Sequence, residues 1–401
     1  MNVVIVGNGL AGTIAAKTLR ELDETVGIEI FGEERYPYYP RPNLIEYLAG
    51  RLPFDKLFAF PEGWSDRQRI GVRLGEKVVR VLPAERRIET ASGLERAYDA
   101  LLLATGARPA LPPVEGIGRK GVFALRTLDD AHGLLGHLGT HKRVVVLGGG
   151  LLGLEVARAV RGREIEVAVV EYFDRLLPRQ LDPDAAAILK IHFERKGIAV
   201  RLGAVVKEIL GVGGVQELRL ESGDRIEADT VVVAAGIVPE TGPARDAGLE
   251  TARGIVVDDL MRTSAPGIFA AGDAAEHRGR IHGIIPAAFE QARSAAFAML
   301  GRERPYGGTM PFNTLKVAGL DVTSVGEFDA AGEGTEALVR SAPESGLYKK
   351  IVLRDGRLVG GIWMGTRKGA AELIRLVTAE RHVEPIKLDL LEEDFDFTEI
   401  L

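Results

Sequence analysis

Cysteine is absent from this chain of 401 residues. Its absence excludes disulfide bonds, thiolate-ligated iron–sulfur clusters, cysteine-bound zinc, and any cysteine nucleophile or redox dithiol. If the chain carries out redox chemistry, that chemistry must therefore run on a bound organic cofactor.

Long apolar runs and a surplus of basic residues are also absent. No apolar run approaches the roughly 20 residues of a membrane span, and Met1 leads directly into a predicted strand, so we expect no targeting leader and a cytoplasmic protein. The 51 basic and 57 acidic residues give a net charge of −6, which argues against general nucleic-acid binding. No metal site is predicted, because the spacing of His132 and His137 puts them on different faces of the helix predicted over 128–138.

A glycine-rich turn stands at the start of the chain, after the short apolar run 3–6, which is typical of a buried parallel strand. Gly7 permits the tight turn, Gly9 lets the backbone approach a pyrophosphate, and Gly12 lets strand and helix pack closely. The helix predicted over 13–22 would direct unpaired N–H groups and a partial positive charge at the phosphates. The pattern predicts a dinucleotide site.

The same pattern recurs after the apolar residues 144–147, with Gly148, Gly150 and Gly153 in the three glycine positions. One such motif is a weak signal, but ordinary strand–helix turns are a poor explanation for two of them in one chain. The sequence thus predicts two dinucleotide sites, within a length that accommodates two or three domains.

An acidic residue after the second strand of such a unit binds a ribose hydroxyl. In the first unit Glu33 is our candidate and Glu34 the second choice, with a solvated turn as the alternative. In the second unit Glu171 ends the strand predicted over 167–171 and would repel a 2′-phosphate. We therefore predict NADH rather than NADPH, although Arg175 stands close enough to leave NADPH open.

Further cofactor contacts are predicted in three segments. Residues 36–44 hold three prolines and Arg41, which could line a flat ring or a pyrophosphate, unless the segment is only a proline-stiffened surface loop. Val78 lies in an alternating strand pattern and could meet an adenine. The small residues 104–106, echoed at 234–236, would let the backbone pass close to a cofactor.

A carboxylate follows another predicted strand later in the chain. Asp273 comes directly after small residues at the end of this strand and could bind a polyol such as ribityl. The helix predicted over 286–300 then carries Glu290 and Gln291 near its start.

The last segment changes character from Met310 onward. Apolar and alternating runs of strand length, a hairpin turn at 355–356 and a helix predicted over 369–380 indicate a small antiparallel α+β domain. The tail over 389–401 mixes acidic residues with phenylalanine. It is either a mobile extension or a strip that docks on this chain or on a partner.

Together these pieces resemble the FAD-dependent pyridine nucleotide-disulfide oxidoreductases over essentially the whole chain. The motifs that carry the resemblance are residues 7–12, 104–109, 148–155 and 269–273. Within the family, residues 39–44 and 313–319 resemble the NADH:rubredoxin reductases and the flavin domain of assimilatory nitrite reductases. The redox cysteine that disulfide reductases place within 41–47 is missing, which excludes the thiol-dependent activities of the family.

The resemblance implies an α/β fold with two interleaved Rossmann-like dinucleotide-binding domains of the glutathione-reductase type and a small C-terminal α+β domain. A discontinuous FAD-binding domain would cover 1–111 and 246–308, and an NAD(H)-binding domain would cover 112–245. Residues 309–401 would form a C-terminal interface domain with the acidic tail.

The resemblance also implies roles for individual residues. The first glycine loop would hold the FAD pyrophosphate, with Arg41 and Pro42 along the flavin, and the second would hold NADH, with Glu155 near the nicotinamide. The predicted catalytic residues are Glu155, Lys316 and Glu290. The predicted cofactor-binding residues are Gly7, Gly9, Leu10, Ala11, Gly12, Glu33, Glu34, Arg41, Pro42, Val78, Ala104, Thr105, Gly106, Arg108, Gly148, Gly150, Leu151, Leu152, Gly153, Glu171, Ala235, Gly236, Gly272, Asp273, Glu290, Gln291 and Lys316.

The activity implied is that of a flavoprotein oxidoreductase in which NADH reduces FAD and the flavin reduces a small acidic iron protein, rubredoxin or a ferredoxin. The alternatives are an NADH oxidase or quinone reductase, a flavin subunit of a larger redox complex, and a redox-sensing interaction protein. A homodimer, or docking of a partner through the C-terminal domain or tail, is also open. The candidate docking cations are Arg41, Arg51, Lys316, Lys349 and Lys350.

Overall fold

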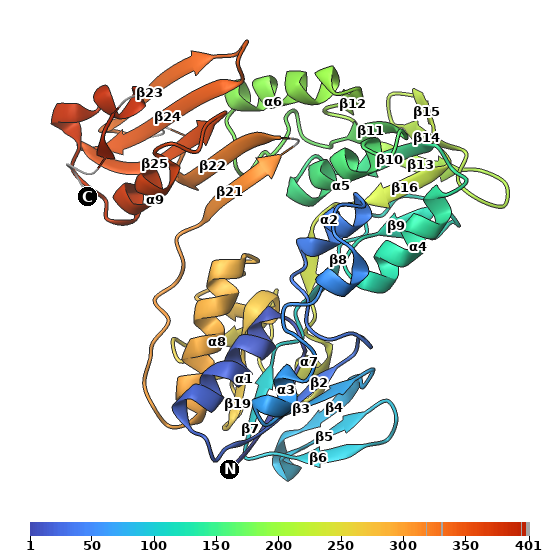
Figure 1. The fold of residues 1–401 in the computed structure, drawn as a ribbon, viewed down its shortest axis with the longest axis vertical. Helices are drawn as coiled ribbons and strands as arrows, with labels where there is room; N and C mark the ends of the chain where they lie inside the picture. Colours follow the sequence, from blue (N-terminus) through green and yellow to red (C-terminus); the bar gives the residue numbers. More distant parts are fainter. Residues whose placement is uncertain (318, 330–331, 394, 398–401) are drawn as a thin grey trace. The chain divides into compact units, whose positions relative to one another are not determined.

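The computed structural model describes residues 1–401 except 318, 330–331, 394 and 398–401 (Figure 1). The described chain forms two compact units. Unit 1 comprises Met1–Pro109, Arg126–Leu128 and Ile237–Thr309, and unit 2 comprises Ala110–Leu125, Asp129–Gly236 and Met310–Leu401.

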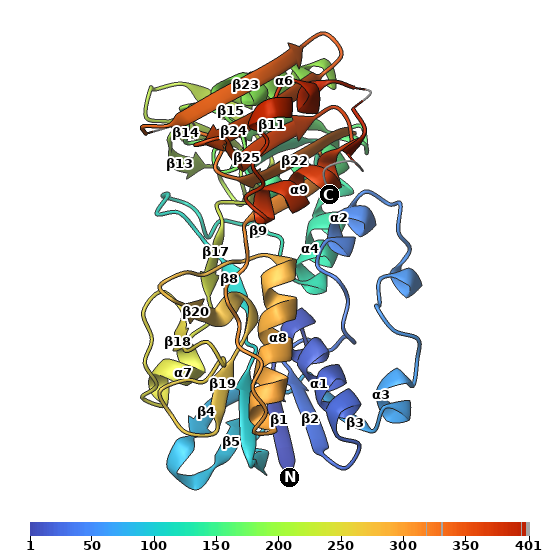
Figure 2. The same ribbon diagram turned by 90° about the vertical axis from the view of Figure 1, so that its left-hand side faces the viewer.

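Unit 1 is built on a five-stranded parallel sheet with the order β19-β7-β1-β2-β3. Its strands are β1 (Asn2–Val6), β2 (Gly27–Gly32), β3 (Ile70–Leu74), β7 (Ala100–Leu103) and β19 (Ile268–Ala270). The central strand β1 is an apolar run because parallel neighbours and the layers above and below bury both of its faces. Helices α1 (Leu10–Leu22) and α8 (Ile285–Met299) pack side by side along this sheet (Figures 1 and 2).

The remaining elements of unit 1 are short. A three-stranded antiparallel sheet and two strand pairs accompany the main sheet. They are β4 (Val78–Leu82), β5 (Arg87–Thr90) and β6 (Glu95–Ala97), the pair β8 (Ala107–Pro109) with β17 (Ile237–Pro239), and the pair β18 (Ile255–Val257) with β20 (Ala275–His277). The short helices are α2 (Asn43–Leu48), α3 (Trp64–Arg67) and α7 (Gly242–Asp246).

Unit 2 repeats this plan with a second five-stranded parallel sheet, of order β12-β11-β10-β16-β9. Its strands are β9 (Val122–Ala124), β10 (Arg143–Leu147), β11 (Glu166–Val170), β12 (Ile198–Arg201) and β16 (Thr230–Val233). The helices are α4 (Leu128–Leu138), α5 (Leu151–Arg161) and α6 (Pro183–Arg195), and the antiparallel strands are β13 (Val206–Leu210), β14 (Glu217–Leu220) and β15 (Arg225–Glu227). In both units the strand before the glycine loop is the central one, which confirms two Rossmann-like folds.

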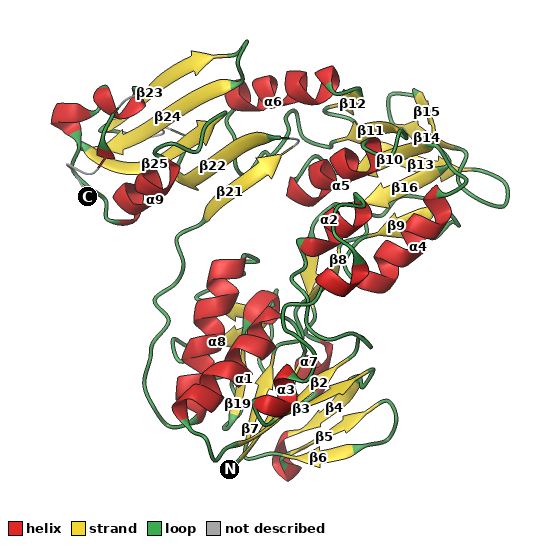
Figure 3. Cartoon of the chain, viewed as in Figure 1, coloured by secondary structure: helices red, strands yellow, loops and turns green. Residues whose placement is uncertain are grey.

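The C-terminal part of unit 2 contains a five-stranded antiparallel sheet, of order β21-β22-β25-β24-β23, together with the α-helix α9 (Figure 3). The elements are β21 (Phe312–Val317), β22 (Leu320–Gly326), β23 (Thr335–Ala342), β24 (Leu347–Arg354), β25 (Arg357–Met364) and α9 (Ala370–Thr378). Asp355 and Gly356 both have positive φ, of 50° and 74°, as the predicted two-residue hairpin turn requires. The α+β expectation is confirmed, while the division into FAD, NAD(H) and interface domains stays a prediction.

The structure corrects one local expectation, adds one strand and decides one open alternative. Helix α1 begins at Leu10 rather than Thr13, because Gly9 is its N-cap and the glycine loop is already part of the first turn. The sequence does not predict the edge strand Val122–Ala124, since three half-buried residues after a linker show no clear hydrophobic period. Of the two alternatives for the tail, the structure supports docking on this chain, because Leu390 and Phe397 are buried in the core of the C-terminal part. Residues Asp394 and 398–401 of the tail, and Ala318 in the motif at 313–319, lie outside the described residues.

Candidate functional site

The first glycine loop is shaped by contacts that only glycine allows. Gly7 has a φ of 115°, and its N–H donates to the carbonyl oxygen of Phe31 at 2.8 Å. A Cβ atom on Gly7 would overlap the carbonyl oxygen of Ala104, and one on Gly12 would overlap that of Gly7. A Cβ atom added to Gly9, in contrast, would have no neighbouring atom of the described chain within 4 Å. The loop is therefore closed where strand and helix pack and open at Gly9.

The second glycine loop has the same geometry. A Cβ atom on Gly148 would overlap the carbonyl oxygen of Ala234, one on Gly153 would overlap that of Gly148, and Gly150 faces open space within 4 Å. Gly9 and Gly150 are the N-caps of α1 and α5, and neither helix start has a side-chain cap. Each loop thus presents uncapped N–H groups beside an open position, which is the arrangement that binds a phosphate group.

The two candidate ribose-binding acids of unit 1, Glu33 and Glu34, differ in their exposure and in their hydrogen-bond partners. The Glu33 side chain is 67% exposed and pairs with Lys77 at 2.9 Å. Glu34 is bound more closely, because its carboxylate accepts from the Tyr39 hydroxyl and from Arg41 Nη2, both at 2.5 Å. Burial raises the pKa of Tyr39, so this phenol stays a neutral donor. Glu34 therefore fixes Arg41, while Glu33 is the carboxylate at the surface.

Glu171 is buried, with only 5% of the residue exposed. Its carboxylate accepts from the N–H groups of Gly149 and Phe173, the latter at 2.8 Å. Arg175 turns back on its own loop, since its Nε donates to the carbonyl oxygen of Leu181 at 3.3 Å. The acid thus lies directly against the second glycine loop.

Asp273 has a partner that the sequence did not suggest. Its Oδ2 lies 2.9 Å from Nη2 of Arg126, and both side chains are less than a quarter exposed. A Cβ atom on Gly106 would stand 3.4 Å from the same Arg126 nitrogen, so the guanidinium also borders the small-residue turn at 104–106. Arg126 is 147 positions away from Asp273, and no local pattern reports such a pairing.

The three predicted catalytic residues are distributed over both units. In unit 2, Glu155 Oε2 accepts from Arg158 at 2.6 Å, while its Oε1 is buried without a hydrogen-bond donor among the described residues. Lys316 is exposed on β21, in the same unit. In unit 1, Glu290 pairs with Arg304 at 2.7 Å. The buried, unpartnered oxygen of Glu155 is the feature that still calls for a donor.

Several other predicted cofactor residues support the loops around them. Gln291 is 1% exposed, and its Oε1 accepts from the N–H of Gly272 at 2.9 Å, which holds the loop that carries Asp273. Thr105 donates its hydroxyl to the carbonyl oxygen of Glu240 at 2.6 Å. Val78 is buried at the start of β4. The flanking predicted residues Leu10, Ala11, Leu151, Leu152, Ala235 and Gly236 lie in or beside the two glycine loops and the turn after β16.

The prediction that Lys349 and Lys350 lie on an exposed docking surface is wrong. Lys349 is only 2% exposed, and its Nζ donates to the carbonyl oxygen of Glu392 at 2.9 Å. Lys350 donates to Asp182 at 2.7 Å, with 11% of its side chain exposed. The two lysines are neighbours on β24 and so point to opposite faces of the sheet, where the tail covers Lys349 and Asp182 at the start of α6 covers Lys350. Lys316 stays the exposed cation of this group in unit 2.

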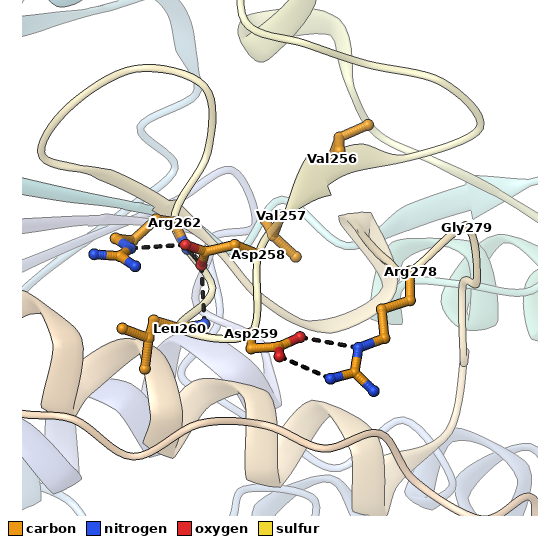
Figure 4. A pocket seen from close by; sticks show the side chains of 8 residues that line it. All are labelled: Val256, Val257, Asp258, Asp259, Leu260, Arg262, Arg278 and Gly279. Carbon is orange, nitrogen blue, oxygen red and sulfur yellow. Dashed lines mark hydrogen bonds and ion pairs between the residues drawn. The ribbon is translucent and has the colours of Figure 1, made fainter.

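A separate surface pocket in unit 1 is not a candidate for the site. It is lined by Val256, Val257, Asp258, Asp259, Leu260, Arg262, Arg278 and Gly279 (Figure 4). Asp258 pairs with Arg262 at 2.8 Å, and Asp259 pairs with Arg278 at 2.7 Å. Hydrogen bonds from Arg278 and His277 lower the pKa of Asp259 to about 2. The charges that line the pocket already neutralise one another.

Within the described residues, no helix is both long and apolar enough to cross a membrane. The same part of the chain holds no group of three or more histidine or acidic residues suited to a metal ion.

Comparison with known proteins identifies the family. Residues 1–295 match the family model described as pyridine nucleotide-disulphide oxidoreductase, and residues 311–381 match the rubredoxin NAD+ reductase C-terminal domain. The chain is 36% identical over 313 residues to a rubredoxin-NAD(+) reductase of Pseudomonas putida, covering 76% of this chain and 81% of that protein. It is 35% identical over 393 residues to a nitrite reductase of Bacillus subtilis (strain 168), covering 97% of this chain and 49% of that protein. The chain spans about half the length of the nitrite and nitrate reductase relatives that it matches.

The fold also agrees with a solved structure. In the covalent complex of putidaredoxin reductase with putidaredoxin, the matching chain superimposes with a TM-score of 0.89 at 28% identity, covering 100% of this chain and 97% of the other. The chain belongs to the pyridine nucleotide-disulphide oxidoreductases, contains no cysteine, and carries a C-terminal domain of the rubredoxin NAD+ reductase type.

Proposed function

We propose that this protein transfers electrons from NADH through FAD to a small iron protein of the rubredoxin class. The observation that carries the proposal is the pair of open glycine loops at uncapped helix starts, one in each unit, in a chain that has a rubredoxin-reductase-type C-terminal domain. Two such loops suit two nucleotides, one the resident cofactor and the other the electron donor.

The residues of unit 1 fit FAD. The N–H groups at Gly9 would bind the pyrophosphate, Asp273 the ribityl hydroxyls, and Glu33 the adenosine ribose. Arg126 would hold Asp273 in place through the ion pair described above, and Arg41, fixed by Glu34, would lie along the flavin with Pro42. Bound FAD would supply both the acceptor for a hydride and the donor of single electrons.

The residues of unit 2 fit NADH. Glu171 would accept from a ribose hydroxyl, and its buried charge opposes the phosphate that NADPH carries there. Arg175, the residue that left NADPH open, is bonded to its own loop at Leu181. The unpartnered Oε1 of Glu155 would accept from the carboxamide of the nicotinamide and so orient the ring. These groups position the reactants, and no acid–base catalyst is needed for hydride transfer.

The acceptor is assigned to rubredoxin from the C-terminal domain, which matches that of rubredoxin NAD+ reductases. The alternative within the same class is a ferredoxin-like protein, because the superimposed reductase forms a complex with putidaredoxin. Exposed Lys316 would contribute to docking an acidic partner, in a protein that we expect in the cytoplasm.

A comparison of electron acceptors tests the proposal. Purified protein would be supplied with NADH and, in turn, rubredoxin, a [2Fe–2S] ferredoxin, a soluble quinone and oxygen, and kcat/KM would be measured for each. We expect turnover of about 10 per second or more with rubredoxin, and Lys316→Glu should raise the KM for rubredoxin and weaken its salt dependence. Faster turnover with oxygen or the quinone would overturn the assignment.

A second candidate function is that of a flavin component in a nitrite-reducing system. It is favoured because the match to nitrite reductase covers 97% of this chain, against 76% for the rubredoxin reductase. The chain alone has no cysteine to bind the iron–sulfur clusters of such a system, so a partner would have to provide them. Copurification of a nitrite-reducing partner, together with slow rubredoxin reduction, would favour this function.

A further inference from the structure

The loop after β11 borders the second glycine loop at both of its ends. At one end Glu171 accepts from the N–H of Gly149, and at the other the N–H of Leu177 donates to the carbonyl oxygen of Gly149 at 3.0 Å. Residues 172–176 therefore form part of the wall of the second site.

This wall presents two exposed aromatic rings. Tyr172 is 67% exposed, the largest exposed fraction of any aromatic side chain in the described chain, and Phe173 is 51% exposed. Their ring centroids are 5.3 Å apart and their planes are perpendicular. An edge-to-face neighbour restricts both rings but covers a face of only one of them, so exposed ring faces remain for a planar ligand.

The backbone of these residues is fixed without a ligand. The N–H of Glu171 donates to the carbonyl oxygen of Arg201 at 2.8 Å, and the N–H of Gly203 donates to that of Phe173 at 2.8 Å. The N–H of Phe173 donates to Glu171 Oε1 at 2.8 Å. The carboxylate proposed to bind the ribose thus also fixes the turn that carries Tyr172.

We propose that Tyr172 is the stacking surface for the adenine of NADH, a binding residue that acts beside Glu171. The inference rests on the proposed function, because it takes NADH as the ligand of the second loop. An aromatic face next to a carboxylate fits an adenosine with free ribose hydroxyls, since the base can stack while the hydroxyls donate to the acid.

Binding of ADP-ribose to the flavin-containing protein tests this inference without turnover. By calorimetry, Tyr172→Ala should weaken ADP-ribose binding about tenfold, as expected for losing one base–aromatic stack, and Tyr172→Phe should keep wild-type affinity. Phe54→Ala is the matched control, because it removes a 43% exposed ring from unit 1 and should change nothing. Unaltered thermal unfolding of Tyr172→Ala would verify that this exposed position does not affect folding.

A second experiment uses reduced nicotinamide mononucleotide, a hydride donor that lacks the adenosine. Flavin reduction by this donor should be equally fast in the wild type and in Tyr172→Ala, while reduction at low NADH concentration should slow in the variant. ADP-ribose affinity within twofold of the wild type, or equal losses with both donors, would overturn the role of Tyr172. If the wild type itself failed to bind ADP-ribose, the proposed function would fall, and this inference with it.

Discussion

At the scale of single residues, buried charged side chains make the hydrogen bonds that link distant parts of each unit. Arg20 of α1 is 8% exposed. Its guanidinium donates to main-chain carbonyl oxygens of Asp23, Glu24, Val26, Gln68 and Arg69, at distances of 2.7 to 3.2 Å. One side chain thus ties the end of α1 to the start of β2 and to the segment before β3.

Replacing this guanidinium should destabilise unit 1. Arg20→Met removes the charged donor and leaves buried carbonyl oxygens without partners, so we expect a loss of about 3 kcal/mol in urea unfolding. Lys17→Met on the same helix is the matched control, because its side chain is 50% exposed and its ion pair with Glu21 is weak at 3.8 Å. The control should change stability by less than about 0.5 kcal/mol. Equal effects of the two substitutions would contradict the account.

Asp182 makes the corresponding connection in unit 2. Its Oδ1 caps α6 at the N–H of Ala185, and its Oδ2 accepts from the Tyr348 hydroxyl at 2.6 Å and from Lys350 at 2.7 Å. Burial alone would raise the pKa of Asp182, but the hydrogen bonds from Lys350 and Tyr348 outweigh it and leave the pKa below its ordinary value. The ionised form is therefore the one that links α6 to the C-terminal sheet.

This link should respond to acid in a defined direction. Because the folded pKa of Asp182 lies below the unfolded value of about 3.9, its contribution is complete above that pH and is lost as the pH falls through the folded value. Asp182→Asn should therefore cost about 3 kcal/mol near neutral pH and less below about pH 3. Exposed Asp184 lies in the first turn of the same helix, and Asp184→Asn should have little effect at either pH. A cost of Asp182→Asn that does not vary with pH would argue against the ionised link.

At the scale of elements, the strand–turn–helix unit separates folding from binding. Gly7 and Gly12 are required by packing, whereas Gly9 and Gly150 have no neighbour that an added Cβ would meet and have ordinary negative φ values of −88° and −79°. Only a bound nucleotide would be displaced by a side chain at these two positions.

Two alanine substitutions should therefore each impair the binding of a different ligand. Gly9→Ala should fold normally but purify with little flavin, and Gly150→Ala should keep its flavin and bind NADH at least about tenfold more weakly. Gly12→Ala is the contrasting variant and should fail to fold, since its Cβ would overlap a backbone oxygen. Flavin content by absorbance and NADH titration measure both effects. Retention of full flavin by Gly9→Ala would remove FAD from the first loop.

The C-terminal tail behaves as an element of its domain. Phe397 is 7% exposed and shares a core with Leu373, Val377 and Leu390. Phe397→Ala should cost about 3 kcal/mol in unfolding free energy, while Leu388→Ala, at a position that is 65% exposed, should cost almost nothing. If Phe397→Ala were as stable as the wild type, the tail would not dock as described.

These elements also mark how far sequence reasoning reaches. Both glycine loops, Glu171 and the α+β segment followed from local period and spacing, because a parallel strand, a tight turn and a helix start are each encoded within about ten residues. The bonds from Arg20 to Gln68 and Arg69, the Arg126–Asp273 pair and the Asp182–Lys350 pair did not, because these partners are at least 48 positions apart in the sequence. Lys349 and Lys350 were misassigned to the surface for the same reason: nothing local shows that the tail and α6 bury them.

At the scale of the whole molecule, the chain holds the same dinucleotide-binding plan twice. The two central strands, β1 and β10, are each paired on one side to the strand after the helix and on the other to the strand before the small-residue turn. We interpret this repeat as one site for a resident cofactor and one for its electron donor. The C-terminal sheet has no counterpart in the repeat, and we assign it to the acceptor.

The most direct test of this interpretation is a sequential anaerobic stopped-flow experiment. The flavin-containing protein would be mixed first with NADH and then with oxidised rubredoxin, and the absorbance of both chromophores would be followed. The account predicts rapid bleaching of the flavin by NADH, much slower bleaching by NADPH, and then reoxidation of the flavin at the rate at which rubredoxin is reduced. A flavin that NADH reduces but rubredoxin does not reoxidise would contradict the proposed electron path.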